Sequence, residues 1–512
     1  MKKILIILVA ILLLFIGNSC SNWLDIRPES EIVLDDYWQN ESQVNQVLAA
    51  CYKSLTEVKA MHHMLAWGEL RSDNVTSGNG MPADMAQILN FDIKPSNYYC
   101  EWGSMYTTIN YCNTLLHYAP HVVDLDANFT EAKLHSVEAE ALAIRALAYF
   151  YLVRTFDQVP WIDQPSIDDV QDYNIPKSEQ SEILDKLIEE LLTAIRYGRD
   201  EFDTVENTKG RFTKNGMRAL LADIYLWKED YSQCIDYCDQ IIADPNLMLV
   251  DGEDVVTEVF SNGNSTESIF ELQFDQELIP NTVLNEFYGN FSNYMGNWSF
   301  PAILANGNYS PFKVRVASGY EGRKDRRLKD FLLQDSGGDK YFIFKYAGYK
   351  RVEDINENSI YYYRNSTPNW IFYRLPDIFL MKAEALVELE TDNAEALRMI
   401  NQTYVRANPD ADALKLSDYS SKFEMEKLVL RERQRELMFE GKRWFDLMRL
   451  TRRSDSPSSL LSYVTKKFSG NTSTEYSKMS VMDALYMPIH TKELEANSAL
   501  VQNPFYEITG EN

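Results

Sequence analysis

Two closely spaced pairs of side chains could, by residue type, hold a metal ion. Cys234 and Cys238 stand four residues apart in a stretch of helical periodicity, and His62 and His63 are adjacent. No second Cys/His pair lies near the cysteines in sequence, and adjacent histidines point in different directions on a helix. Both pairs therefore indicate packing or loop roles. We predict no cofactor, and a structural calcium ion in a loop is left open as an alternative.

The chain contains no sequence motif for covalent catalysis, metal-assisted hydrolysis or phosphate binding. The sequence contains no His-Glu-x-x-His, no Gly-x-Ser-x-Gly and no glycine-rich phosphate loop. Glycoside hydrolysis needs only two suitably spaced carboxylates, and 76 Asp and Glu residues make such a pair unavoidable. A surface glycoside hydrolase is thus an alternative without a supporting motif, and the prediction is that the protein is not an enzyme.

The densest charge cluster is RERQRE, at residues 431–436. A capping box at Ser421 and Glu424 predicts that this segment belongs to a helix running through Glu440. Pairs at i, i+3 join Glu432 to Arg435 and Arg433 to Glu436 within such a helix. This spacing favours a self-paired helix face over an anion-binding site.

Aromatic side chains, 12% of the residues, are the more informative surplus. They gather around 98–106 and 287–298, and again at 361–370, among many Asn, Ser and Gly residues. A flat ring beside amide and hydroxyl groups suits a ligand with one apolar face and a rim of hydroxyls, which describes a sugar. The other aromatic rings are interpreted as core residues.

The first twenty residues predict a destination outside the cytoplasm. Two lysines precede an apolar run of 13 residues, Ile4–Ile16, which is too short for a permanent membrane span and is typical of a secretory signal. The small residue before Cys20 resembles a bacterial lipoprotein signal, in which that cysteine is lipidated and begins the mature chain. A free or disulfide-bonded Cys20 after an ordinary signal is the alternative. A net charge of -26 argues against nucleic acid as a partner.

Helical spacing dominates residues 40–250, with one segment, 139–156, apolar on nearly every side and therefore predicted to be buried. Residues 210–245 have the length and spacing of a tetratricopeptide-like helical hairpin, and a second hairpin is predicted over 376–408. Residues 251–370 read as a loop-rich insertion with short β-elements. The fold class is therefore mainly α, a tetratricopeptide-like hairpin scaffold that carries this insertion. The predicted division is a signal peptide at 1–19, an N-terminal helical part at 20–250, the insertion at 251–370, C-terminal hairpins at 371–455 and a tail packed on the scaffold at 456–512.

Five cysteines remain after Cys20 is assigned to lipid. Cys100 and Cys112 could pair in an oxidising compartment, whereas Cys51 is predicted to be helical and buried. Because five is odd, at least one thiol must stay unpaired or bond outside the chain.

A series of motifs in fixed order carries a family resemblance. They are CSNWLDIRPES (20–30), GELRSDN (68–74), AEALAIRALAYFYLVRTF (139–156), RFTK (211–214), RLPDIFLMKAEAL (374–386), RQRELMFEGKRWFDL (433–447), MPI (487–489) and QNP (502–504). In this order the chain resembles, over nearly its whole length, the SusD/RagB-type outer-membrane nutrient-binding lipoproteins of Bacteroidetes.

The resemblance implies four tetratricopeptide-like hairpins, no catalysis, and a lipid anchor at Cys20 on the cell surface. It also implies a SusC-like TonB-dependent transporter as partner and an oligosaccharide as ligand, with peptide capture as the alternative found in some branches. In relatives the ligand site draws on an N-terminal loop region and on the insertion. The residues of this chain in those regions that we predict to bind ligand are Asn74, Tyr98, Trp102, Tyr288, Tyr294 and Trp298.

Overall fold

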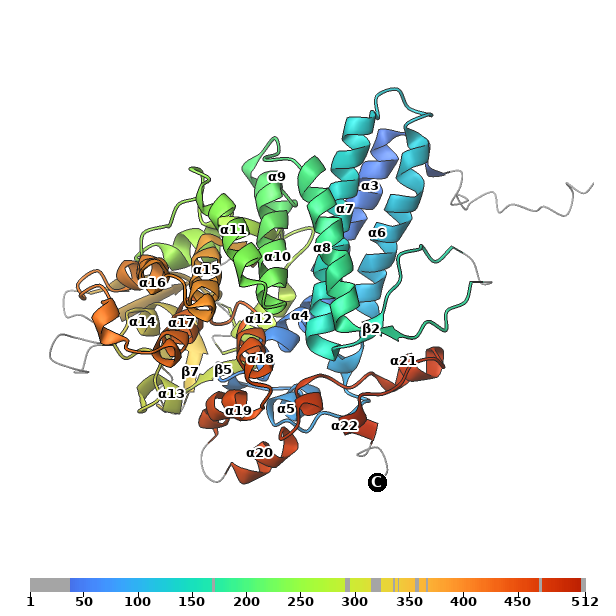
Figure 1. Ribbon diagram of the computed structural model, residues 1–512. Helices are drawn as coiled ribbons and strands as arrows, with labels where there is room; N and C mark the ends of the chain where they lie inside the picture. The colour runs from blue at the N-terminus through green and yellow to red at the C-terminus, as the bar shows by residue number, and fades with distance from the viewer. Residues whose placement is uncertain are drawn as a thin grey trace, which may run out of the picture.

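Helices that neighbour one another in a row make up most of the chain (Figure 1). The computed structural model describes residues 37–507, apart from 168–170, 291–294, 315–323, 335–336, 339, 355–358, 365–366 and 469–471. Cys20, the signal segment and Tyr294 lie outside the described residues. The mainly helical fold class predicted from the sequence is confirmed.

The N-terminal part is a group of long helices around one central helix. Its elements are α3 (Glu41–Thr56), α4 (Val58–Leu65), η2 (Ala66–Leu70), β1 (Thr76–Ser77), α5 (Ala83–Leu89), η3 (Tyr98–Cys100), α6 (Gly103–Val122), α7 (Glu131–Phe156), β2 (Val159–Pro160), β3 (Lys177–Ser178), α8 (Gln180–Tyr197) and α9 (Val205–Gly210). Helix α7 contacts α3, α6, α8 and α10, so every residue of 139–156 except Leu142 is buried. The prediction of a helix buried on all sides is confirmed.

Both predicted hairpins form. The first is α10 (Lys214–Trp227) with α11 (Tyr231–Ile242), and the second is α15 (Leu375–Leu389) with α16 (Asn393–Ala407). Asp392 caps the start of α16, because its carboxylate accepts the Glu395 backbone N–H at 2.9 Å. Helix α11 packs against α15, which places the two hairpins side by side although 132 residues (243–374) lie between them in sequence.

The arginine-rich helix α17 (Lys422–Leu437) ends before Glu440, where the sequence predicted its end. Phe439 and Gly441 adopt left-handed φ angles of 66° and 70°, which reverse the chain into α18 (Arg443–Ser454). The cap at Ser421 is confirmed, since its hydroxyl accepts the Glu424 N–H at 3.3 Å.

The RERQRE segment is not a solvated helix face, because from Glu432 onward its side chains are buried. The predicted pair of Arg435 with Glu432 forms at 2.5 Å. The predicted pair of Arg433 with Glu436 is wrong, because Arg433 instead pairs with Asp446 of α18 at 2.9 Å. Packing of α15 and α18 on this helix supplies partners that the sequence spacing could not indicate.

One antiparallel strand pair encloses most of the insertion. Strand β4 (Ser268–Leu272) pairs with β10 (Trp370–Arg374), and both are fully buried. Strands β5, β6 and β7, which form a sheet of order β1-β5-β7-β6 with β1 of the N-terminal part, and a β8–β9 hairpin lie between them in sequence, so short β-elements are present as predicted. The elements of this region are η4 (Val255–Asn262), α12 (Thr282–Tyr288), β5 (Trp298–Pro301), α13 (Ala302–Asn306), α14 (Arg327–Phe331), β6 (Leu332–Gln334), β7 (Lys340–Ile343), β8 (Gly348–Glu353) and β9 (Ser359–Tyr363).

The C-terminal tail runs along one side of the molecule, at the bottom of Figure 1. Its elements are α19 (Ser458–Val464), η6 (Thr465–Lys467), α20 (Ser473–Lys478), η7 (Met482–Leu485), α21 (Thr491–Ala496) and α22 (Pro504–Glu507). A further short helix, η5 (Leu416–Asp418), lies in the scaffold between α16 and α17. The backbone N–H of Met487 donates to the Thr155 carbonyl at 2.8 Å, and the Arg71 guanidinium donates to the Leu485 carbonyl at 2.6 Å. These bonds fasten the tail to the N-terminal helices.

All five described cysteines are free and buried. The possible disulfide between Cys100 and Cys112 therefore does not form in this structure. Cys112 instead hydrogen bonds with Cys51, and this bond together with burial raises the pKa of the Cys51 thiol well above its usual value. Cys234 and Cys238 pack in the core as predicted. Within the described part of the chain, no helix is both long and apolar enough to cross a membrane.

Candidate functional site

The two regions in which the sequence predicted ligand contacts meet in one surface. Strand β1 pairs antiparallel with β5, with Thr76 opposite Ser299. Two further bonds extend the pairing, from Gly78 N to Asn297 O at 2.8 Å and from Asn79 N to Gly296 O at 2.9 Å. Segments more than 200 residues apart in sequence are thereby joined edge to edge.

Three of the predicted contact residues do not reach that surface. Asn74, Tyr288 and Trp298 are each 0% exposed. The Asn74 amide donates to Glu69 at 2.8 Å, the Tyr288 hydroxyl donates to the Phe439 carbonyl at 2.7 Å, and the Trp298 indole donates to Met85 Sδ at 3.4 Å. The expectation that these side chains are exposed is wrong, because they fill the core between the insertion and the helices. Tyr294 belongs to the residues that the structure does not describe.

Tyr98 and Trp102 lie nearer to solvent. The half-buried Tyr98 ring packs edge-on against Tyr99, and its hydroxyl is 3.5 Å from His62 Nδ1. Trp102 is the residue before α6, is 3% exposed, and packs edge-on against Tyr106. Tyr98 is thus the predicted residue with the most accessible ring among those described.

A groove of about 480 Å³ opens beside Trp102. Its walls come from the start of α6, from the loop after β2 and from α21 with the residues that follow it. The lining residues are Trp102, Gly103, Tyr106, Ile109, Asn110, Asn113, Pro160, Ile162, Ser166, Tyr173, Glu493, Ala496, Asn497 and Leu500. Aromatic rings and amides therefore share one concave surface, and Tyr173 leaves 46% of its surface exposed there.

Two asparagines of α6 shape this groove by holding the neighbouring loop. The Asn110 side-chain oxygen accepts the Ser166 N–H at 2.8 Å. The Asn113 amide donates to the Ile162 carbonyl at 3.0 Å. The loop wall is therefore fixed to the helix wall. Sequence reasoning missed Tyr173 and Asn497, because the three segments of the groove are brought together only by folding.

An ion-pair cluster lies beside Tyr98, with the Lys59 ammonium 5.8 Å from its ring centroid. Glu101 pairs with Lys59 and with Lys492, the latter at 3.2 Å. Partial burial acts to raise the pKa of Glu101, but the hydrogen bonds and charges of the two lysines lower it below its usual value. Glu286 of the insertion accepts a hydrogen bond from His62 Nε2 at 3.0 Å. This face thus carries fixed charges of both signs beside its rings.

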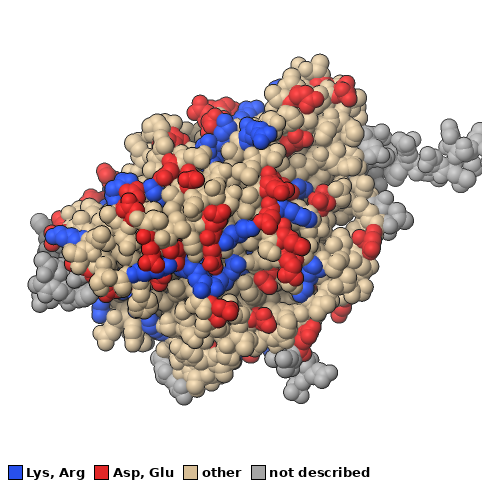
Figure 2. All heavy atoms as spheres, viewed as in Figure 1, with Lys and Arg blue, Asp and Glu red and all other residues tan. Residues whose placement is uncertain are grey.

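The adjacent histidines have separate roles, as predicted. His63 is 0% exposed, stacks on Trp67 with ring centroids 5.2 Å apart, and donates through Nε2 to the Tyr98 carbonyl at 3.1 Å. Burial lowers the pKa of His63 to about 3. No group of three or more His, Cys, Asp or Glu side chains suited to a metal ion occurs among the residues described. The interleaved surface charges of the face in Figure 2 form no segregated basic patch there.

The GELRSDN segment (68–74) behind this surface is buried and makes hydrogen bonds with a distant part of the chain. Asp73 accepts two hydrogen bonds from the Arg443 guanidinium, at 2.7 and 3.0 Å, and the Asn74 side-chain oxygen accepts one from Gln434 at 3.0 Å. Glu69 Oε1 accepts the Phe439 N–H at 3.0 Å. These hydrogen bonds join the segment to the RQRELMFEGKRWFDL segment (433–447), about 370 residues away in sequence.

Glu69 makes the free energy of unfolding depend on pH. Burial raises the pKa of its carboxyl to about 7, and Oε2 has no hydrogen-bond partner among the described residues. Because the native pKa lies above the unfolded value, native Glu69 holds a proton that the unfolded chain releases, so stability falls as pH rises from about 4.5 to about 7. We expect Glu69→Gln to reduce this loss by about 3 kcal/mol.

Urea unfolding of both proteins at pH 5 and pH 8 measures this effect. Other buried carboxyls titrate identically in the two proteins, so the wild-type minus variant difference isolates Glu69. An equal change between pH 5 and pH 8 in the two proteins would refute the assignment.

The fold is a row of helical hairpins whose loops form a surface lined by aromatic rings and amides. This arrangement is that of a scaffold for ligand binding. Residues 22–226 match the family model described as "Starch-binding associating with outer membrane", and residues 306–506 match that of the SusD family. A SusD-like protein of Formosa agariphila is 24% identical over 480 residues, covering 88% of this chain and 91% of that protein. A SusD-like protein of Bacteroides ovatus is 23% identical, covering 92% and 86%.

Solved structures agree on the fold. A SusD superfamily protein of Bacteroides vulgatus superposes with a TM-score of 0.72 at 22% identity, covering 91% of this chain and 99% of that chain. The chain belongs to the SusD/RagB family. This assignment places it among carbohydrate-binding proteins of nutrient uptake that associate with the outer membrane.

Proposed function

We propose that the protein is a non-enzymatic surface lipoprotein that binds oligosaccharides between Tyr98 and the groove beside Trp102. It would be anchored through lipid on Cys20 and would pass its ligand to a SusC-like TonB-dependent transporter. The observation that carries the ligand assignment is the groove itself, where Tyr173 and Tyr106 lie beside Asn497 in a concavity of about 480 Å³.

This lining matches the chemistry of a sugar ring. The exposed Tyr173 face offers a flat apolar surface, and the Asn497 and Glu493 side chains offer polar groups at its edge. Stacking of this kind requires neither a nucleophile nor a tuned proton donor. Affinity per sugar ring should be modest, with specificity coming from the shape of the groove and its few polar groups.

Tyr173→Ala is expected to weaken oligosaccharide binding about fivefold to tenfold, because one stacking contact contributes about 1 kcal/mol. Isothermal titration calorimetry against a panel of oligosaccharides measures the change. Tyr476→Ala is the matched control, since Tyr476 is 40% exposed on α20, outside the groove. Peptide binding together with silence across the oligosaccharide panel would overturn the glycan assignment.

The anchor and the transporter are tested together by detergent extraction of native membranes. The wild-type protein should co-purify with a large β-barrel protein, and Cys20→Ser should move to the soluble fraction. Extraction without any barrel partner would refute the transporter part of the proposal, and a membrane-bound Cys20→Ser protein would refute the anchor.

A further inference from the structure

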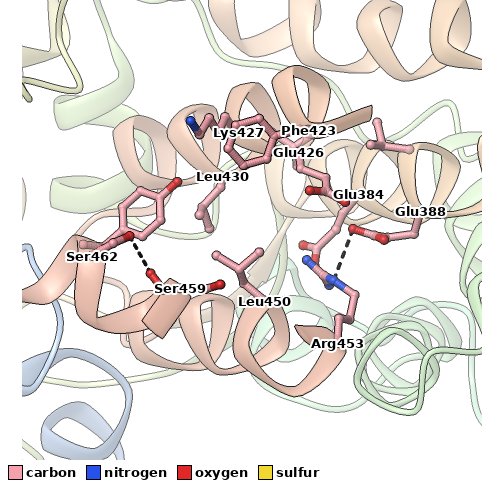
Figure 3. A pocket seen from close by; sticks show the side chains of 13 residues that line it. Glu384, Glu388, Phe423, Glu426, Lys427, Leu430, Leu450, Arg453, Ser459 and Ser462 are labelled. Atoms are coloured by element: carbon pink, nitrogen blue, oxygen red, sulfur yellow. Dashed lines mark hydrogen bonds and ion pairs between the residues drawn. The ribbon is translucent and has the colours of Figure 1, made fainter. Parts of the chain in front are cut away.

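A cavity of about 180 Å³ lies between the second hairpin and the start of the tail, away from the surface described above. Helix α17 forms one wall, and α15, α18 and α19 form the others (Figure 3). The lining residues are Glu384, Val387, Glu388, Phe423, Glu426, Lys427, Val429, Leu430, Leu450, Arg453, Ser459, Ser462 and Tyr463. We refer to this cavity as the α17 pocket.

Aliphatic and aromatic side chains form the body of the α17 pocket. Leu430 and Leu450 face each other from α17 and α18 across the open space (Figure 3). Phe423, at the first turn of α17, is 60% exposed, and the Lys427 ammonium lies 3.8 Å from its ring centroid. Lys427 shows that a cation already occupies one position against this aromatic ring.

Carboxylates collect on one side of the pocket, where Glu384, Glu388 and Glu426 lie near one another (Figure 3). Glu384 is neutralised by the Arg449 guanidinium at 2.7 Å and by that of Arg453 at 2.9 Å. Glu388 pairs with Arg453 at 3.2 Å and with Lys422 at 3.1 Å.

Glu426 is the exception among these three acids. In the described part of the chain, its carboxylate has neither an ion pair nor a hydrogen bond, although the side chain is half-buried and lines the cavity. Burial first, and then the charges of Glu384 and Glu426, raise the pKa of Glu388 against the opposing effects of Arg453 and Lys422. Of the three carboxylates on this side, Glu384 and Glu388 are therefore paired with cations of the protein, and Glu426 has no partner among the described residues.

We propose that the α17 pocket receives a basic side chain, lysine or arginine, from a partner polypeptide. Its methylene stem would pass between Leu430 and Leu450, and its cationic group would stop beside Glu426. A cavity of on the order of 150 Å³ accommodates a benzene-sized group, so the α17 pocket has room for such a stem but not for a folded segment of chain.

Charge complementarity excludes other side chains. An acidic group would meet the unpaired Glu426 carboxylate, and a purely aliphatic one would leave that carboxylate unpaired as its water is displaced. A partner polypeptide is favoured over a free amine because the mouth is apolar. Phe423, which lines the pocket, is 60% exposed. Exposed apolar residues around a pocket are typical of protein contacts.

Saturation-transfer difference NMR on the full chain tests the proposal with three probes. The first is Nα-acetyl-lysine N-methylamide, the second is its norleucine counterpart, which keeps the stem and lacks the charge, and the third is n-hexylammonium. The lysine probe should bind in the millimolar range, as expected for a ligand of this size, and the norleucine probe about tenfold more weakly or not at all.

Two variants localise the binding. Glu426→Gln should weaken the lysine probe about tenfold and leave the norleucine probe unchanged. Leu450→Phe should fill the pocket and abolish binding without loss of thermal stability. Glu189→Gln, an exposed acid on α8, is the matched control and should have no effect.

Equal binding of the lysine and norleucine probes would overturn the proposal, as would a lysine affinity that Glu426→Gln leaves unchanged. Binding of n-hexylammonium without binding of the lysine probe would mark a free-amine site instead. Absence of binding by all three probes would refute any ligand role of the pocket.

Discussion

Arg374→Met is expected to lower the free energy of unfolding by about 3–5 kcal/mol. Arg374 is 0% exposed and donates to three carboxylates from different parts of the chain. It reaches Glu436 Oε1 at 2.7 Å, Glu440 at 2.7 and 2.9 Å, and Glu267 at 3.1 Å. Methionine fills a similar volume but leaves those charges buried with fewer counter-charges, and an uncompensated buried charge is among the most destabilising changes known.

Urea unfolding at pH 7 measures the effect, with Arg398→Met as the control. Arg398 pairs with Glu395 on the surface of α16, where its side chain is 58% exposed. A solvent-exposed pair of this kind contributes at most about 1 kcal/mol. Equal losses in the two variants would show that the buried network does not depend on Arg374.

Lowering the pH should reduce the difference in free energy of unfolding between the wild-type protein and Arg374→Met. Burial would raise the pKa of the Glu436 carboxyl, but Arg406, Arg374 and Arg327 hold it well below its usual range. Stability that comes from a lowered native pKa is present above the unfolded value and is lost as pH falls toward the native value. Below about pH 4 the wild-type protein therefore loses more stability than the variant.

The same network explains where sequence reasoning about charge stopped. The i, i+3 rule found the pair of Glu432 with Arg435, because both partners lie on one helix. It could not find the partners of Glu436, because Arg374 precedes α15 and Arg327 belongs to the insertion. Local spacing therefore predicted the helix and one pair, whereas tertiary packing determined that the cluster is buried.

For the aromatic residues too, what depends on local sequence could be predicted and what depends on tertiary packing could not. The hairpins and the buried α7 could be predicted because helical periodicity is a local signal. Which rings of the insertion face solvent is not a local property. Trp298 lies on a strand fully buried between β1 and β7, whereas Tyr173 follows a loop held by Asn113 and Asn110. The family resemblance indicated the regions around 74–102 and 288–298, whereas the groove also draws on residues 160–173 and 493–500, which only folding brings to Trp102.

Gly68→Ala is expected to cost at least about 3 kcal/mol, for a reason independent of charge. Gly68 lies in the short π-helix η2, and a Cβ at this position would stand 1.8 Å from the Gly441 carbonyl oxygen. That oxygen belongs to the backbone turn between α17 and α18, so it cannot move without shifting the turn. The close approach is what lets Asp73 reach Arg443 and Glu69 reach the Phe439 N–H.

Gly103→Ala provides the contrast, because the nearest atom to a new Cβ there is a flexible Glu493 oxygen at 3.8 Å. That variant should be neutral or slightly more stable, since alanine restricts the unfolded chain. Urea unfolding of both variants, with hydrogen exchange at the Phe439 amide, separates a local loss from a global one. If Gly68→Ala unfolds like wild type and still protects the Phe439 amide, the two segments are not held by this contact. Loss of that protection would instead show that the N-terminal and C-terminal segments can dock only because Gly68 has no Cβ.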